Sequence, residues 1–261
     1  MSMPKNNLVK LFSDKNDLSK KLICYFPVGD PVANSIKLAD TYINAGADVL
    51  EIGLAVDNPY LDGKVVTDSM ERTKKAITET DCYSLIKTIR KNHPTAALEI
   101  MCYKQIFNTT QIDSFSQFLE DAKIDALLVA DNTSNENIQL KHHLPKRISL
   151  VSFMPYESGD EEFEYLNKYG DGFIFLQAVN GSTGKRSSLD PKLAEKIKIA
   201  KERIPNTPIC PGFGISTPEQ CEQIKETDAD GLIIGSAIIE KMIQGENQLR
   251  KFIVDCKDSL R

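Results

Sequence analysis

The feature that most constrains the fold is a short apolar run followed by an amphipathic segment, repeated about every 30 residues along the chain. This alternation is typical of parallel βα units, in which a helix connects each strand to the next. It predicts eight strands, at Leu22–Phe26, Val49–Gly53, Leu98–Tyr103, Ala126–Ala130, Ile148–Phe153, Phe173–Gln177, Thr207–Cys210 and Leu232–Gly235. The expected fold class is therefore α/β, a single (β/α)8 TIM barrel that spans residues 1–261.

Two further patterns favour a closed barrel over an open doubly wound sheet. Several predicted strands are apolar at nearly every position, which fits strands covered on one face by the barrel interior and on the other by helices. An aspartate also precedes four of the strands, at Asp48, Asp125, Asp171 and Asp230, and this is weak internal repetition of the kind that a barrel shows. No Gly/Ser-rich linker divides the chain, so we expect one domain. The open sheet remains the alternative, although it more often uses five or six strands.

Composition narrows the classes of function. The net charge of -5 argues against nonspecific binding of nucleic acid, and three histidines leave few candidates for a metal site. We therefore expect no metal and a catalytic role for carboxylates. Six cysteines without a C-x-x-C pair suit a reducing cytoplasm. There is no run of about 18 consecutive apolar residues and no apolar segment near the N-terminus, so we expect a cytoplasmic protein that does not bind membranes.

Three glycine clusters follow the last three predicted strands, at Asn180–Gly184, Pro211–Ser216 and Gly235–Ala237. Loops after the last strands of a TIM barrel commonly bind phosphate, and a missing Cβ lets backbone N–H groups approach the anion closely. Each glycine alone could serve only as a turn. Three clusters after successive strands favour a phosphate site at the C-terminal face of the barrel.

Two carboxylates stand in unusual places. Glu51 lies within the apolar run VLEIG, where a charge is costly unless it is paired or has a function. Asp62 lies in the segment NPYLDG, whose Pro and Gly indicate a loop. Taken separately, Glu51 could be a structural acid and Asp62 a turn former.

The residues then carry a family resemblance. The motifs are VGDP near the first strand, AGADVLEIG at the second, NPYLDG after it, STG after the sixth, and PGFGISTPEQ with GLIIGSAI near the end. From about Leu22 to Met242 the chain resembles the tryptophan synthase alpha chain family. The family's Glu and Asp, eleven residues apart, recur here as Glu51 and Asp62.

The resemblance implies a lyase that cleaves indole-3-glycerol phosphate to indole and glyceraldehyde 3-phosphate by a retro-aldol reaction, without metal or organic cofactor. It implies that Glu51 is the general acid and base, and that Asp62 accepts the indole N–H and stabilises the cationic intermediate. Thr183 matches a loop threonine that orients this aspartate, and Tyr25 matches an aromatic position of the pocket.

Other positions follow from the same resemblance. Ile100, Leu128 and Phe213 look like walls of the indole slot, although they could equally be plain core. Phe175 stands beside the catalytic glutamate, where the family typically has a tyrosine. The residues implied to hold the phosphate are Gly184, Gly214, Gly235 and Ser236.

The family works as an α/β/β/α heterotetramer in which indole passes to a beta chain, so pyridoxal phosphate is expected only in that partner. This chain departs from the family in the loop Ala55–Gly63, where P-F-S-D-P-L-A-D-G is usual, and also at Lys104, at Ala130–Thr133 and at Val179–Ser182. Two alternatives therefore stay open. One is an alpha-like subunit with little lyase activity that activates a beta chain, and the other is a different phosphate-binding TIM-barrel enzyme.

Overall fold

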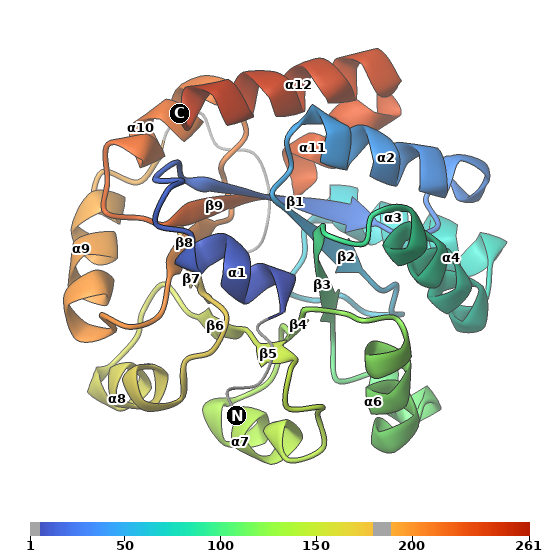
Figure 1. The fold of residues 1–261 in the computed structure, drawn as a ribbon, viewed down its shortest axis with the longest axis horizontal. Helices are drawn as coiled ribbons and strands as arrows, with labels where there is room; N and C mark the ends of the chain where they lie inside the picture. Colours follow the sequence, from blue (N-terminus) through green and yellow to red (C-terminus); the bar gives the residue numbers. More distant parts are fainter. Residues whose placement is uncertain (1–5, 180–188) are drawn as a thin grey trace.

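The computed structural model describes residues 6–179 and 189–261, and in these ranges nine short parallel strands lie inside a ring of helices (Figure 1). The strands hydrogen-bond as two sheets, in the orders β5-β4-β3-β2-β1-β9 and β6-β7-β8. Their bounds are β1 Lys21–Pro27, β2 Val49–Gly53, β3 Ala97–Cys102, β4 Ala126–Val129, β5 Ser149–Leu150, β6 Ser152–Met154, β7 Ile174–Gln177, β8 Ile209–Gly212 and β9 Gly231–Ile234.

Backbone hydrogen bonds continue across both seams between the two sheets. The fifth predicted strand is broken at Val151, whose N–H donates to the carbonyl oxygen of Leu127 in β4 over 2.9 Å. At the other seam the N–H of Asp230 donates to the carbonyl oxygen of Ile209, also over 2.9 Å. The two sheets therefore form one barrel, and the expected (β/α)8 fold is confirmed, with its fifth strand written as β5 and β6.

The outer layer consists of helices whose buried side chains face the strands. Two of them, α4 and α7, begin with capping boxes, in which Thr78 and Thr133 exchange hydrogen bonds with the third helical residue. No helix in the described part of the chain is long and apolar enough to cross a membrane. The helices are α1 Asn7–Ser13, η1 Val32–Asn34, α2 Ser35–Ala45, α3 Lys64–Ala76, α4 Glu79–Asn92, α5 Ile106–Thr109, α6 Ile112–Asp121, α7 Ser134–Lys141, α8 Asp160–Tyr169, α9 Leu193–Arg203, α10 Pro218–Lys225, α11 Ser236–Ile243 and α12 Glu246–Ser259.

The four aspartates that repeat in the sequence have one shared structural role. Each carboxylate accepts a hydrogen bond from a backbone N–H of the preceding strand of the barrel, and each also pairs with a lysine or arginine. The backbone donors are Leu22, Leu98, Leu150 and Ile209. The cations paired with Asp48, Asp125, Asp171 and Asp230 are Lys257, Arg90, Lys141 and Lys201. The barrel is thus built as four similar pairs of strands.

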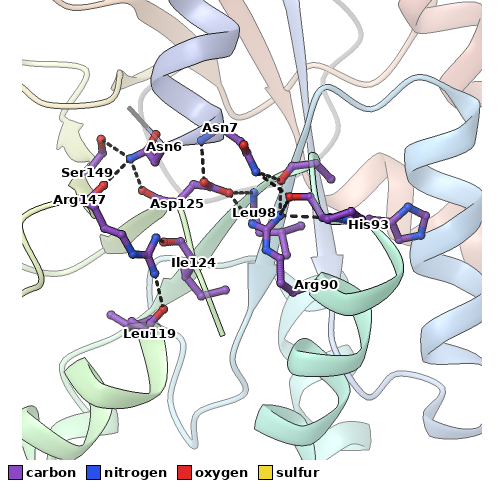
Figure 2. A network of polar contacts seen from close by, with 12 residues as sticks. Asn6, Asn7, Arg90, His93, Leu98, Leu119, Ile124, Asp125, Arg147 and Ser149 are labelled. Atoms are coloured by element: carbon purple, nitrogen blue, oxygen red, sulfur yellow. Dashed lines mark hydrogen bonds and ion pairs between the residues drawn. The ribbon is translucent and has the colours of Figure 1, made fainter. Parts of the chain in front are cut away.

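The ion pair between Asp125 and Arg90 is the most buried of the four, and Asp125 also fixes the N-terminal helix α1 (Figure 2). Its carboxylate accepts from Arg90 Nη2 at 2.5 Å, from the N–H of Leu98 at 2.9 Å and from the N–H of Asn7 at 2.8 Å. The side chain of Asn6 donates to the backbone carbonyls of Asp125 and Arg147. This end of the barrel, where the strands begin, is therefore devoted to stability, as is usual for this fold.

The strand register places three polar side chains side by side in the barrel interior. Cα pairing places Tyr25 of β1 beside Glu51 of β2, and Glu51 beside Glu99 of β3. Paired residues of neighbouring parallel strands project to the same face of the sheet. All three side chains are almost fully buried.

Candidate active site

A pocket opens at the carboxyl ends of the strands, where TIM-barrel enzymes have their active sites. It brings together most of the residues that the sequence predicted for the site. These are Tyr25, Glu51, Asp62, Phe175, Phe213, Gly214, Gly235 and Ser236. Thr183 and Gly184 lie outside the described residues, so their predicted roles stay predictions.

Glu51 lies in the wall of this pocket and is held by β2. Its side chain is buried, and among the described side chains its Oε1 has no hydrogen-bond partner. Burial, and secondly the charge of Asp62, raise the pKa of Glu51 to about 8. A carboxyl group with such a pKa holds its proton at neutral pH and can still release it, which suits both an acid and a base.

Asp62 lies in the loop after β2 and is half-buried. Its backbone N–H donates to the carbonyl oxygen of Pro59, which closes a turn before α3. The hydroxyl of Tyr103 donates to Asp62 Oδ2 over 2.7 Å. Tyr103 follows β3 directly and is fully buried, so it fixes one oxygen of the carboxylate. The sequence analysis missed Tyr103, because no motif marks it and its contact with Asp62 joins residues that are 41 positions apart in the chain.

Tyr25 packs between the strands because its neighbour is a glycine. A Cβ at Gly53 would lie 2.1 Å from the hydroxyl oxygen of Tyr25, so any larger residue would displace the ring. The Tyr25 hydroxyl has no hydrogen-bond partner among the described residues. Burial, followed by the charges of Asp62 and Glu51, raises its pKa well above the usual value. The hydroxyl therefore stays protonated and can donate.

The rings of Phe175 and Phe213 form an apolar wall of the pocket, and the ring of Phe153 packs against both of them. The ring centroid of Phe175 lies 5.4 Å from that of Phe153 and 5.5 Å from that of Phe213. Phe213 has a φ of 74°, a strained value for a residue with a bulky side chain, and Gly214 follows with a φ of 80°. Strain of this kind often accompanies functional loops. The wall offers a surface for an aromatic ligand.

The glycine-rich part of the pocket has the features of an anion site. Gly214, from the loop after β8, and Gly235, before α11, line the same pocket, as the sequence predicted. Gly235 caps the N-terminus of α11, whose first N–H groups carry partial positive charge. Ser236 is buried, and its Oγ has no partner in the described part of the chain. A dianion would satisfy these donors.

Two predicted wall residues do not line the pocket. Ile100 pairs with Ile52 and Leu127, and it alternates with Glu99 and Met101, so it faces the helix layer instead of the barrel interior. The prediction for Ile100 is therefore corrected, and Met101 takes its place in the lining.

Leu128 pairs with Met101 and shares its inward face, but β4 contributes no residue to the described lining. It packs in the barrel interior. The sequence analysis also missed the apolar lining residues Val66, Met101 and Ile233, while the lining residues Ile215 and Ala237 belong to the predicted glycine clusters.

Comparisons with known proteins point in one direction. A family model described as tryptophan synthase alpha chain matches residues 12–259. The tryptophan synthase alpha chain of Salmonella typhimurium is 31% identical over 262 residues, which cover 96% of this chain and 97% of the relative.

Solved structures agree on the fold. The tryptophan synthase alpha subunit of Legionella pneumophila superposes with a TM-score of 0.88 at 23% identity, covering 98% of this chain and 99% of that one. A structure from Aquifex aeolicus also gives 0.88, at 25% identity and with the same coverage. Tryptophan synthase of Mycobacterium tuberculosis gives 0.85 at 23% identity, covering 99% of each chain.

Proposed function

Because this chain belongs to the tryptophan synthase alpha chain family, we propose that it cleaves indole-3-glycerol phosphate to indole and glyceraldehyde 3-phosphate. The observation that carries this proposal is one pocket that combines Glu51, with its raised pKa, Asp62, an aromatic wall and the N-terminus of α11. The substrate requires each of these groups, since it carries an indole ring, a reacting hydroxyl and a phosphate.

The proposed reaction uses Glu51 twice. Protonated Glu51 first gives its proton to C3 of the indole ring, which becomes a cationic indolenine. The resulting carboxylate then takes the proton from the hydroxyl on the adjacent glycerol carbon. The bond between that carbon and C3 breaks, its electron pair returns to the ring, and indole and the aldehyde leave. A group with a pKa of about 8 is suited to both steps.

Asp62 supports the cation that exists between these steps. Its carboxylate accepts the indole N–H and opposes the positive charge of the ring. The hydrogen bond from Tyr103 holds this carboxylate in one orientation. The rings of Phe175 and Phe213 pack against the indole, while Gly214, Gly235 and Ser236 bind the phosphate.

The same family membership supports proposals about the setting of the reaction. We infer that the chain serves tryptophan biosynthesis in the cytoplasm as the partner of a beta chain in a heterotetramer. Pyridoxal phosphate then belongs to that beta chain, and the alpha reaction needs no cofactor, because Glu51 and Asp62 supply its proton transfer and its charge stabilisation.

The experiment that tests the proposal measures indole release from indole-3-glycerol phosphate by the purified chain, alone and with a beta chain from the same cell. We expect release by the chain alone and faster release with the beta chain. No release in either case, together with stimulation of the beta chain, would replace the lyase with an alpha-like activating subunit. Turnover of a different sugar phosphate alone would favour another TIM-barrel enzyme.

A further inference from the structure

Glu99 is a second buried glutamate that the proposed reaction does not use. It lies on β3 opposite Glu51 of β2, and the two are direct Cα partners. Met101, two residues further along β3, lines the pocket, so Glu99 projects into the barrel interior one position deeper. Its side chain is 0% exposed and it is not part of the pocket lining.

The polar atoms of this pair lack partners. Both carboxyl oxygens of Glu99, and Oε1 of Glu51, accept no hydrogen bond from any described side chain or backbone group. An ionised carboxylate in such a place is strongly unfavourable, so the buried acid keeps its proton. Burial, and secondly the neighbouring Glu51, indeed raise the pKa of Glu99 well above the usual value. A neutral carboxyl group is a donor, and buried donors find acceptors.

Glu51 is the acceptor that the strand register places directly beside Glu99. The titratable groups that interact with the pair are Asp62, which Tyr103 holds, Tyr25 and Cys24 of β1, and Cys210 of β8. In the described part of the chain, no lysine or arginine contributes to the pKa of either glutamate. The negative charge that appears on Glu51 after it releases its proton therefore has no cationic partner there.

We propose that Glu99 is a positioning residue for Glu51: it stays protonated inside the barrel and donates a hydrogen bond to the inner oxygen of Glu51 when Glu51 is ionised. This role rests on the proposed function of Glu51 as the acid and base. The bond holds one oxygen of Glu51, so that the other oxygen faces the pocket. It also stabilises the ionised form, which the second step of the reaction requires.

The proposed hydrogen bond predicts the direction in which the pKa of Glu51 changes when Glu99 is replaced. Because a donor favours the ionised form, its removal raises the pKa of Glu51, whereas removal of a negative charge would lower it. Glu99→Leu should therefore shift the titration of Glu51 upward by about one pH unit, the effect of one hydrogen bond to a charged group. Glu99→Gln keeps a donor in its amide and should leave the titration close to that of the wild type.

The test is an NMR titration of protein labelled with ¹³C at the glutamate carboxyl groups, with Glu51 and Glu99 assigned from the signals missing in Glu51→Gln and Glu99→Gln. In the wild type, Glu99 should stay protonated at pH values where Glu51 ionises, and this measurement needs neither Glu99→Leu nor turnover. In Glu99→Leu, the signal of Glu51 should move at higher pH. An unchanged or lowered titration of Glu51, or ionisation of Glu99 before Glu51, would overturn the proposal.

Activity provides the second readout and separates the two proposals. The reaction starts from protonated Glu51, so the rate of indole release should fall as the pH rises through the pKa of Glu51. This alkaline limb should move upward in Glu99→Leu and return in Glu99→Gln. Absence of indole release from the wild type would defeat the proposed function, while the NMR titration would still decide whether Glu99 donates to Glu51.

Discussion

Tyr103→Phe isolates the hydrogen bond that orients Asp62. The substitution removes the hydroxyl that donates to Asp62 Oδ2 over 2.7 Å and keeps the ring, which packs 5.8 Å from the ring of Tyr60. A hydrogen bond to a charged group is worth about 1.5–3 kcal/mol. Asp62 is half-buried, so water can replace part of the lost bond, and we expect a loss near the lower limit. That corresponds to roughly a tenfold decrease in kcat.

The assay is steady-state indole release from indole-3-glycerol phosphate. Asp62 opposes a charge that forms only after C3 is protonated, so kcat should fall while KM changes little. Tyr60→Phe is the matched control, because its hydroxyl lies 3.4 Å from Asp131 and its side chain is 57% exposed. The control should retain wild-type rates. Equal kcat values for the two variants would refute the role of Tyr103.

Three further predictions concern stability and the anion site. The folded-state pKa of Glu51, about 8, exceeds its ordinary value of 4.5, so ionisation of Glu51 lowers the free energy of unfolding as the pH rises from about 4.5 to 8. Thermal unfolding should therefore show that Glu51→Gln is more stable than the wild type at pH 9, by a few kcal/mol, and similarly stable at pH 4. Gly235→Asp places a negative charge beside the phosphate and should raise KM at least tenfold; an unchanged KM would count against the anion site. Asp125→Asn leaves Arg90 buried without its counter-ion, and urea unfolding should show a loss of about 3 kcal/mol; a loss below about 1 kcal/mol would contradict this.

The fold was predictable because the barrel repeats one simple pattern. Apolar runs marked the strands closely, and the aspartates before four of them proved to pair neighbouring strands. The break at Val151 was not predictable, since Val151 is as apolar as Leu150 before it and no Gly or Pro marks the interruption. The inward face of β3 was also missed: Glu99 shares that face with Met101, but the apolar residues around it alternate with no visible pattern, and Ile100 was chosen where Met101 lines the pocket.

The site was predictable to the extent that a residue conflicted with its surroundings. Glu51 was noticed because a carboxylate interrupts an apolar run, and Asp62 because a resemblance supported it. Glu99 carries the same signal as Glu51, in the run ALEIMC, but no motif drew attention to it. Tyr103 acts through Asp62, a contact between distant segments that only the folded chain displays.

The central claim is that Glu51 transfers the proton during cleavage, and Glu51→Gln tests it most directly. Glutamine keeps the shape of the side chain but cannot take up and release the proton. Indole release from indole-3-glycerol phosphate should fall by about 10²- to 10⁴-fold relative to wild type, while substrate binding, measured by calorimetry, should be retained. A Glu51→Gln variant that releases indole at the wild-type rate would contradict the account.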